Sequence, residues 1–223
     1  MENINVSKTK VNYLEPSHGR ILLYNNIYIT PNRLVKGNSK LHNILIFDLT
    51  AIKSCLNCKD CKDNCYAVKA QRMYNDTMIF RETNLNMVKN DLLLLKCLII
   101  KQLDGTKINT VRIHSSGDFY NQNYVDMWNK VIERYPHINF YAYSKVEKIL
   151  NFSDIVKHKN FNLITSFVNE KINFGKIDYC EKLNKDFNTF ICPVGYTNKH
   201  KEFKCGKDCI YCVTEKNVCF VQH

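Results

Sequence analysis

The chain has 223 residues, eleven cysteines and a formal net charge of +11. A chain of this length allows one large domain or two small ones, and it can bury an apolar core without disulfide staples. It opens without the apolar stretch of a secretory signal, and its longest apolar run, 92–100, is too short to span a bilayer. We therefore expect a cytoplasmic protein with no membrane partner, whose cysteines bind metal rather than form disulfides.

The first predicted element is a β-hairpin at 20–30, with an Asn-Asn turn between two runs of strand-forming residues. The short apolar run at 43–49 has strand character, and a cysteine-rich loop follows it directly. Two helices are expected next, at 66–75 and at 78–102. The second of them is long and partly buried, and we expect Cys97 within it to be a buried small apolar residue.

The middle of the chain alternates strand patterns with helix patterns. Strands are predicted at 109–114, 138–144, 161–167 and 187–193, and helices at 123–136 and 146–158. In the first of these helices an apolar stripe that includes Trp128 recurs at helical spacing and is expected to belong to the core. An alternation of this kind predicts a parallel sheet, since parallel strands need crossover connections.

The predicted fold class is therefore α/β: a partial or open barrel of parallel strands with cysteine-rich metal-binding loops and an N-terminal β-hairpin. Four or five strand–helix units are too few to close an eight-stranded barrel. Residues 1–40 are expected to form the hairpin extension. Residues 41–223 are expected to form a single α/β metal-binding domain that is closed by a cysteine-rich tail.

Polar and thiol side chains follow nearly every predicted strand. Because the C-terminal ends of parallel strands share one edge, and functional groups collect there, these residues predict a functional site. They are Cys55 to Cys65, His114 to Asp118, Ser144 and Lys145, Ser166 and Phe167, and Cys192.

The first cysteine group follows the pattern C-x2-C-x2-C-x3-C. Its members are Cys55, Cys58, Cys61 and Cys65. Thiolates at this spacing can converge on one metal centre, and the spacing matches the ferredoxin run that binds iron–sulfur clusters, without its final proline. Zinc also accepts four thiolates, so both metals stay open, and iron–sulfur is preferred because the cysteines lie closer together than the paired halves of a zinc ribbon.

The second cysteine group lies near the end of the chain. Its members are Cys192, Cys205, Cys209 and Cys212. The last three form C-x3-C-x2-C, a spacing that also occurs in radical S-adenosylmethionine enzymes, where three thiolates leave one iron open for the cofactor. A second metal site with four thiolates is the preferred interpretation, and chance recurrence in a cysteine-rich chain is the alternative.

The segment "HSSGD" at 114–118 is the remaining candidate for chemistry, because a polar cluster ends a strand at a glycine turn. We assign His114 and Asp118 as candidate catalytic residues. The candidate cofactor-binding residues are Ser115, Ser116, Gly117 and Lys145. The structural alternatives are helix capping by Ser116 or Asp118 and a core role for His114.

Several motifs, in their order and spacing, resemble the phage gene product 88 family over residues 40–215. They are "CKDNCYAVKAQR", Asn84, "VRIHSSGDFYNQNYVDMWNKVIERYPHINFYAYSK" and the closing "CP…CGKDCIYC". The resemblance implies a cysteine-rich protein of phages and mobile elements, distantly similar to radical S-adenosylmethionine barrels. In those barrels a cysteine loop follows the first strand and a Gly-Gly-Glu-like motif follows the second, places that the first cysteine group and Ser116-Gly117-Asp118 take here. The first loop departs from the C-x3-C-x2-C of those enzymes.

Together these features predict an iron–sulfur-binding protein of phage type, a candidate radical S-adenosylmethionine-like enzyme acting on nucleic acid or nucleotide. Its cofactors would be one or two iron–sulfur clusters, [4Fe–4S] by preference, and S-adenosylmethionine. The alternative is a non-catalytic nucleic-acid-binding protein with structural zinc. The net charge of +11 supports a nucleic-acid partner, although scattered lysines also fit an ordinary solvated surface.

Overall fold

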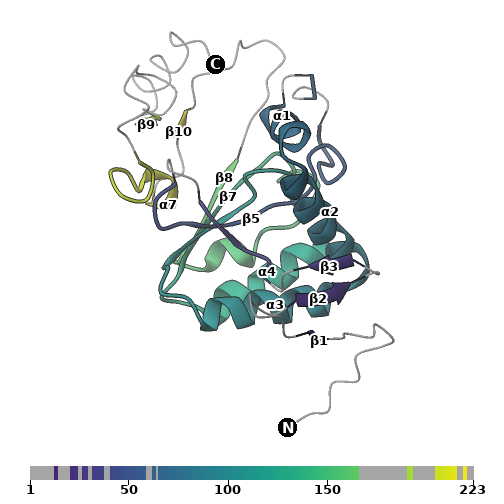
Figure 1. The fold of residues 1–223 in the computed structure, drawn as a ribbon. Coiled ribbons are helices and arrows are strands. Elements are labelled where there is room, and N and C mark those ends of the chain that lie inside the picture. Colours follow the sequence, from purple (N-terminus) through teal and green to yellow (C-terminus); the bar gives the residue numbers. More distant parts are fainter. Residues whose placement is uncertain are drawn as a thin grey trace.

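The structure is a computed structural model, drawn as a ribbon in Figure 1. It describes residues 13–14, 21–24, 27–29, 32–37, 41–58, 62–63, 65–165, 190–192, 204–214 and 218–219. The central element is a five-stranded sheet in the order β4-β5-β6-β7-β8. Its strands are β4 (Val35–Lys36), β5 (Leu45–Phe47), β6 (Thr110–Ile113), β7 (Asn139–Ser144) and β8 (Phe161–Thr165).

Strands β5 to β8 are parallel, and only β4 runs antiparallel to its neighbour. The sheet is open, with β4 at one edge and β8 at the other. The prediction of an α/β fold with an open arrangement of parallel strands is therefore confirmed. The N-terminal hairpin is confirmed too: β2 (Ile21–Tyr24) and β3 (Ile27–Ile29) pair antiparallel, and β1 (Tyr13–Leu14) adds to them as a third strand.

The crossover after β5 contains three helices where two were predicted. They are α1 (Tyr66–Met73), α2 (Asn75–Asn90) and α3 (Leu92–Asp104). A continuous helix over 78–102 is wrong, because Asp91 leaves helical geometry with φ −141° and ψ 50°. Asn90 and Asp91 are weak helix formers whose side chains compete for backbone hydrogen bonds, so the chain bends there.

Two other predicted elements differ from the structure. The helix expected over 146–158 is reduced to turns and the short 3-10 helix η1 (Ile155–Lys157). Asn151 accepts a hydrogen bond from the backbone of Ser153, a local turn that competes with helix formation. The last predicted strand is present as β9 (Phe190–Ile191), but it pairs with β10 (Val218–Cys219) rather than with the central sheet.

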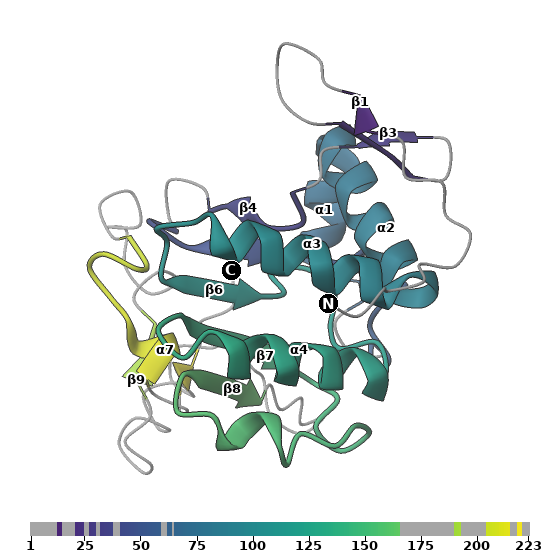
Figure 2. The same cartoon turned by 90° about the horizontal axis from the view of Figure 1, so that it is seen from below.

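One face of the sheet packs on α3 and α4 (Gln122–Arg134), which lie side by side beneath it (Figure 2). The alternating side chains of the strands divide between the two faces. Phe47 and Phe140 belong to the large core on this helix-covered face, where Trp128 meets both rings edge-on at 5.4 and 6.4 Å between ring centroids. This core agrees with the predicted apolar stripe.

The opposite face carries a smaller cluster and receives the tail segment 204–214, which ends in α7 (Tyr211–Thr214). Across this face the register aligns Ile46, Arg112, Tyr141 and Asn162 in one row. The amide of Asn162 donates to the carbonyl of Cys212 at 3.0 Å and so attaches the tail to β8. We call this the tail-covered face.

Candidate functional site

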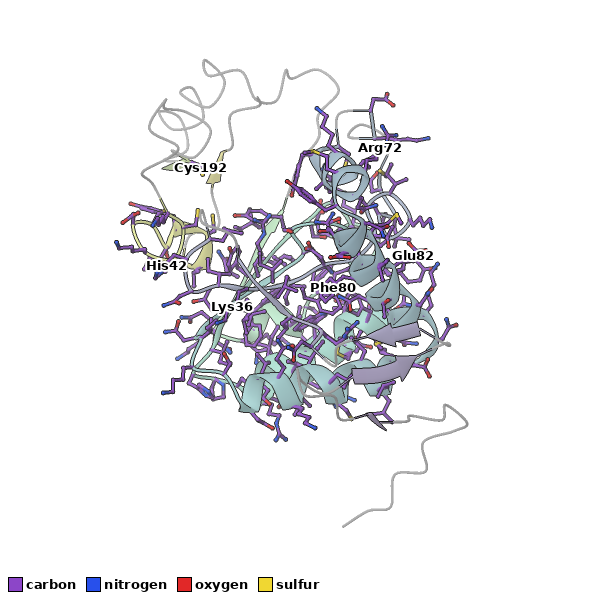
Figure 3. The ribbon with its side chains drawn as sticks, viewed as in Figure 1. Lys36, His42, Arg72, Phe80, Glu82 and Cys192 are labelled. Atoms are coloured by element: carbon purple, nitrogen blue, oxygen red, sulfur yellow. The ribbon has the colours of Figure 1, made fainter. Side chains whose placement is uncertain are left out.

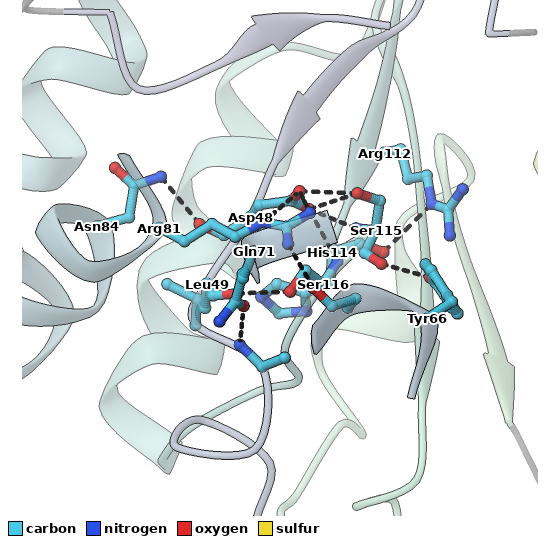
Figure 4. Close-up of polar contacts among 12 residues, drawn as sticks. Asp48, Leu49, Tyr66, Gln71, Arg81, Asn84, Arg112, His114, Ser115 and Ser116 are labelled. Atoms are coloured by element: carbon cyan, nitrogen blue, oxygen red, sulfur yellow. Dashed lines mark hydrogen bonds and ion pairs between the residues drawn. The ribbon is translucent and has the colours of Figure 1, made fainter. Parts of the chain in front are cut away.

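The densest polar network of the described chain is centred on Asp48, the residue that follows β5 (Figure 4). One carboxylate oxygen accepts hydrogen bonds from the backbone N–H groups of Ser115 and Ser116, at 2.6 and 2.9 Å. The other accepts from Arg81, at 2.8 Å to its terminal nitrogen. Asp48 is 6% exposed, so its charge is desolvated and depends on these donors.

Helix α2 supplies the second half of the network. Asn84 donates to the backbone carbonyl of Asp48 at 2.9 Å and accepts from Arg33 at 2.9 Å. Arg81 also donates to the carbonyl of Ala67 in α1. These contacts fix α1 and α2 against the C-terminal end of β5.

Neither Asp48 nor Arg81 belongs to a motif that predicts a functional site from the sequence. The available signal for Asp48 was its position directly after an apolar strand. For Arg81 the only signal was a basic residue within a helix, which is ordinarily solvated.

The segment 114–118 forms a tight turn between β6 and α4. His114 has φ +69° and Gly117 has φ +84°, both in the left-handed region. A Cβ on Gly117 would clash with Oγ of Ser54 and lie 2.7 Å from Cβ of Leu49. The turn is held from both sides, since Leu49 and Ser116 exchange hydrogen bonds of 3.0 and 2.9 Å. Gly117 therefore lies in a tight turn, as the sequence predicts, and close packing leaves no room for a larger residue there.

His114 is enclosed by aromatic rings. Its side chain lies among Phe47, Phe119 and Tyr124, and its Nε2 is 2.9 Å from the Tyr124 hydroxyl. Among the described residues Nδ1 has no hydrogen-bond partner. Burial lowers the pKa of His114 to about 3, with a further contribution from Arg112, so the ring is neutral at pH 7. A catalytic role for His114 stays a prediction.

Asp118 joins the end of β6 to the end of β7. Its carboxylate accepts from the backbone of Phe119 at 2.8 Å, from the hydroxyl of Ser144 at 2.9 Å and from the backbone of Lys145 at 2.9 Å. Burial raises the pKa of Asp118, while these hydrogen bonds oppose the increase. The alternative that Asp118 caps the following helix is wrong, because Asn121 caps α4 by accepting from the backbone of Tyr124. Its catalytic role stays a prediction.

The four candidate cofactor-binding residues lie at the same strand ends. Ser115 donates its hydroxyl to Asp48, and its backbone carbonyl accepts from the Tyr66 hydroxyl. Lys145 gives its N–H to Asp118, and its carbonyl accepts from Asn57 at 3.1 Å. The structure thus brings Ser115, Ser116, Gly117 and Lys145 together at one edge, but their role with a cofactor stays a prediction.

The first cysteine group begins in the turn after β5. Cys55, Cys58 and Cys65 are half-buried, Cys65 directly precedes α1, and Cys61 lies outside the described residues. The contact of Asn57 with Lys145 holds this loop across the C-terminal end of β7. The described part of this loop therefore lies beside the C-terminal end of the sheet.

The second cysteine group lies on the tail-covered face. Cys205 and Cys209 form a β-bridge, and Gly206 between them has φ +83° and is packed against the carbonyl of His42. Cys205 and Cys212 pack on the cluster that contains Tyr141 and Tyr143. Figure 3 shows Cys192 and His42 on the tail side of the molecule, opposite Arg72 and Glu82.

The tail thiols influence one another and the tyrosines beneath them. Burial raises the pKa of Cys205 to about 11, with further contributions from Cys212 and Cys209. Burial also raises the pKa of Tyr141, and Cys212, Cys205 and Cys192 add to that increase. Cys209 therefore acts electrostatically on Cys205, and Cys192, Cys205 and Cys212 act on Tyr141. The expectation that the strand before Cys192 belongs to the central sheet is wrong, since among the described strands β9 pairs with β10.

Cysteine is the right donor for iron–sulfur clusters and for zinc, so the donor chemistry fits both. Within the described part of the chain, however, no three His, Cys, Asp or Glu side chains are grouped closely enough to hold a metal ion.

Cys97 is exposed on α3 instead of buried, because Leu95, Leu98 and Ile99 take the side that faces the core. No described helix has the length and apolar character needed to cross a bilayer.

The family model described as gene product 88 matches residues 25–204. The chain belongs to the gene product 88 family. The match spans the hairpin strand β3, the whole central sheet and both sides of the Asp48 network. It confirms the resemblance carried by the first cysteine group and "HSSGD", whereas the closing "CGKDCIYC" lies just beyond the matched residues. No curated protein and no solved structure matches this gene product 88 chain.

Proposed function

We propose that this gene product 88 protein binds iron–sulfur clusters through its two cysteine groups. One observation carries the proposal: both groups approach the C-terminal end of β7. Asn57 of the first group's loop contacts Lys145, and the thiol of Cys212 interacts with the hydroxyl of Tyr143. Two loops from distant parts of the sequence, each carrying cysteines, thus approach the same end of β7.

The metal is proposed to complete the site rather than to fill a preformed one. Cys55, Cys58, Cys61 and Cys65 would supply one set of ligands, and Cys192, Cys205, Cys209 and Cys212 the other. A thiol must lose its proton to bind metal, and the metal then compensates for the repulsion between neighbouring thiolates. Metal binding would therefore stabilise the tail on the sheet and the first loop on α1, in a cytoplasm that keeps thiols reduced.

The enzymatic form of the proposal adds S-adenosylmethionine and a nucleic-acid or nucleotide substrate. The resemblance to radical S-adenosylmethionine barrels supports it, as do the polar groups at the ends of β6 and β7. Ser115, Ser116, Gly117 and Lys145 would contact the cofactor, with His114 and Asp118 as the reacting or positioning groups. Because Asp118 already accepts three hydrogen bonds, its contribution would be to hold Lys145 and Ser144 in place.

The second candidate is a non-catalytic nucleic-acid-binding protein with structural zinc. The engagement of His114 and Asp118 in internal contacts favours it, because a scaffold needs no reactive group at these positions. A surface on α1 also favours it. Tyr66 and Tyr74 are 64% and 59% exposed, and Lys69 and Arg72 are exposed beside them. Aromatic rings flanked by cations are the usual platform for single-stranded nucleic acid.

Anaerobic purification followed by analysis of iron, zinc and acid-labile sulfide tests the proposal. Iron and sulfide support clusters, zinc supports the second candidate, and a protein free of both metals contradicts both. Single Cys55→Ser and Cys205→Ser substitutions should each lower the metal content and the yield of soluble protein. Cys97→Ser is the matched control, since that thiol is exposed on α3 and is expected to leave the metal content unchanged.

Nucleic-acid binding is tested separately by titration of single-stranded and duplex DNA and RNA at two salt concentrations. Binding should weaken steeply with salt, because each neutralised phosphate releases counter-ions. Tyr74→Ala together with Arg72→Gln should weaken binding if the α1 surface is used. Absence of binding at low salt would contradict a nucleic-acid partner.

A further inference from the structure

Arg112 is a half-buried cation that is held in a fixed position near the C-terminal end of β6. Its Nε donates to the backbone carbonyl of His114 at 3.2 Å, and its guanidinium carbon lies 5.1 Å from the ring centroid of Tyr143. These two contacts restrict the plane of the guanidinium. They leave its terminal nitrogens without a hydrogen-bond partner among the described residues, so Arg112 presents a fixed pair of donors.

The terminal nitrogens of Arg112 are open to a ligand from outside. Buried polar atoms without a partner do occur in the described chain, at Nδ1 of His114 for example, but none belongs to Arg112. None of the ion pairs among the described residues involves Arg112, since Asp48 pairs with Arg81 instead. Figure 4 shows the terminal nitrogens turned away from the Asp48 carboxylate. A planar, accessible guanidinium of this kind matches the oxygens of a phosphate or a carboxylate.

An exposed aromatic ring lies beside this cation. Tyr66, the first residue of α1, is 64% exposed, and its hydroxyl donates to the backbone carbonyl of Ser115. Arg112 and Tyr66 thus hold the consecutive carbonyls of His114 and Ser115 (Figure 4). Burial acts to lower the pKa of Arg112, but Tyr66 and further neighbours raise it overall, so the phenol is within electrostatic reach of the guanidinium. The ring is anchored at its hydroxyl while most of its surface stays free.

We infer that Arg112 and Tyr66 form a binding site for one nucleotide unit, free or within a single strand. Arg112 would bind the phosphate through its terminal nitrogens, and Tyr66 would stack on the base. Lys69 is exposed one turn further along α1, on the same side as Tyr66, where it can meet an adjacent phosphate. The inference rests on the nucleic-acid or nucleotide part of the proposed function, and it does not require metal at the cysteines.

The first test uses a labelled single strand of about eight nucleotides, with binding followed by fluorescence anisotropy at several salt concentrations. Arg112→Gln should weaken binding by at least about tenfold, because a charge-assisted contact is lost. It should also reduce the slope of log affinity against log salt by about one, as expected for one phosphate contact. Arg134→Gln is the matched control, since Arg134 is exposed on α4, and it should bind like wild type. Wild-type affinity in Arg112→Gln would overturn the inference.

The salt dependence separates a phosphate contact from a residue that merely supports folding. A destabilised variant has less folded protein to bind, but each folded molecule keeps its phosphate contacts and hence the wild-type slope. Arg112→Lys retains the charge and loses the planar donor pair, so it should keep the slope and bind a few-fold more weakly. Weaker binding by Arg112→Gln with an unchanged slope would make Arg112 a folding residue and overturn the inference.

Competition with small ligands tests the role of the ring. Adenosine 5′-monophosphate should displace the strand at a concentration at least about fivefold lower than ribose 5-phosphate, because only the first has a base to stack. Tyr66→Ala should abolish this preference. Tyr66→Phe keeps the ring, loses the hydroxyl and should retain the preference. If inorganic phosphate competes as well as the nucleotide, the site accepts a free oxyanion and the inference fails.

The outcomes distinguish this inference from the proposed function. A wild-type protein that binds no strand at low salt contradicts the inference together with any nucleic-acid partner, and leaves the metal proposal standing. Binding that is lost in the Tyr74→Ala, Arg72→Gln double variant but unchanged in Arg112→Gln contradicts only the inference. It would place the nucleic acid on the α1 surface alone.

Discussion

Phe140 and Tyr141 are neighbours in β7, yet they point into two different kinds of interior. Phe140 belongs to the core between the sheet and helices α3 and α4, where nearly all neighbours are hydrocarbon. Tyr141 faces the tail, with Arg112 beside it and three cysteine thiols near enough to affect its pKa. The buried side chains on the helix-covered face are largely apolar and pack against one another. The tail-covered face carries Arg112 and the thiols of Cys205 and Cys212 beside its apolar residues.

The difference shows how one sheet can separate stability from function. Apolar burial stabilises a fold roughly in proportion to area and needs no exact partner. Polar groups in a poorly hydrated place must each find a partner or remain unfavourable. Substitutions on the two faces should therefore differ in size and in their dependence on metal.

The largest expected effect is on the helix-covered face. Phe140→Ala should lower the free energy of unfolding by about 3–5 kcal/mol, because a fully buried ring is removed and a cavity remains. Urea denaturation measures this, and the loss should be the same with and without a chelator. Val213→Ala, which truncates a half-buried tail residue that packs on the other face, should cost about 1 kcal/mol or less. A larger effect at Val213 would contradict this ranking of the faces.

The next effect concerns Asp48, at the C-terminal end of β5. Asp48→Asn removes the charge that compensates Arg81 and weakens the acceptor for the Ser115 and Ser116 amides. Breaking a buried pair in this way should lower the free energy of unfolding by about 3–5 kcal/mol. Glu82→Gln is its control, because the Glu82–Lys53 pair is 38% and 62% exposed and should contribute less than about 1 kcal/mol. Similar losses in both variants would show that Asp48 is not the organising residue.

The central sheet could be predicted because its strands are apolar runs separated by helical patterns, which local periodicity reveals. The break at Asp91 and the separate pairing of β9 could not, since both depend on where distant elements pack. The cysteines and "HSSGD" stood out by spacing and position. Arg112 did not, because a single arginine inside a strand is unremarkable until the register places it beneath the thiols.

Asp118→Asn should have a smaller effect, of about 1–3 kcal/mol in the free energy of unfolding. One amide oxygen can still accept from Phe119 and Ser144, but the amide nitrogen would face the N–H of Lys145, donor against donor. Thermal or urea unfolding measures the loss. Asp126→Asn on the exposed side of α4 serves as the control. Stability equal to wild type in Asp118→Asn would mean that the carboxylate is not needed to join β6 to β7.

The last effect is absent at pH 7 and appears only in acid: a pH dependence that the helix-covered face should contribute. His114 has a pKa of about 3 in the folded protein, lowered first by burial and then by Arg112, against about 6.5 when unfolded. Above pH 6.5 both states carry a neutral ring, so this group adds no pH dependence. As the pH falls below 6.5, His114 takes up a proton in the unfolded chain but stays neutral in the folded protein. The free energy of unfolding should then decrease by up to about 1.4 kcal/mol per pH unit.

His114→Asn tests this dependence, because Asn tolerates the left-handed backbone at this position and does not titrate. The variant should be less stable at pH 7, since the ring packing is lost, but its stability should decline less between pH 6.5 and pH 5. His137→Asn replaces an exposed histidine and should keep the wild-type slope. If His114→Asn and wild type decline in parallel, the acid sensitivity lies elsewhere, and the cysteine-bearing face becomes the next place to look for it.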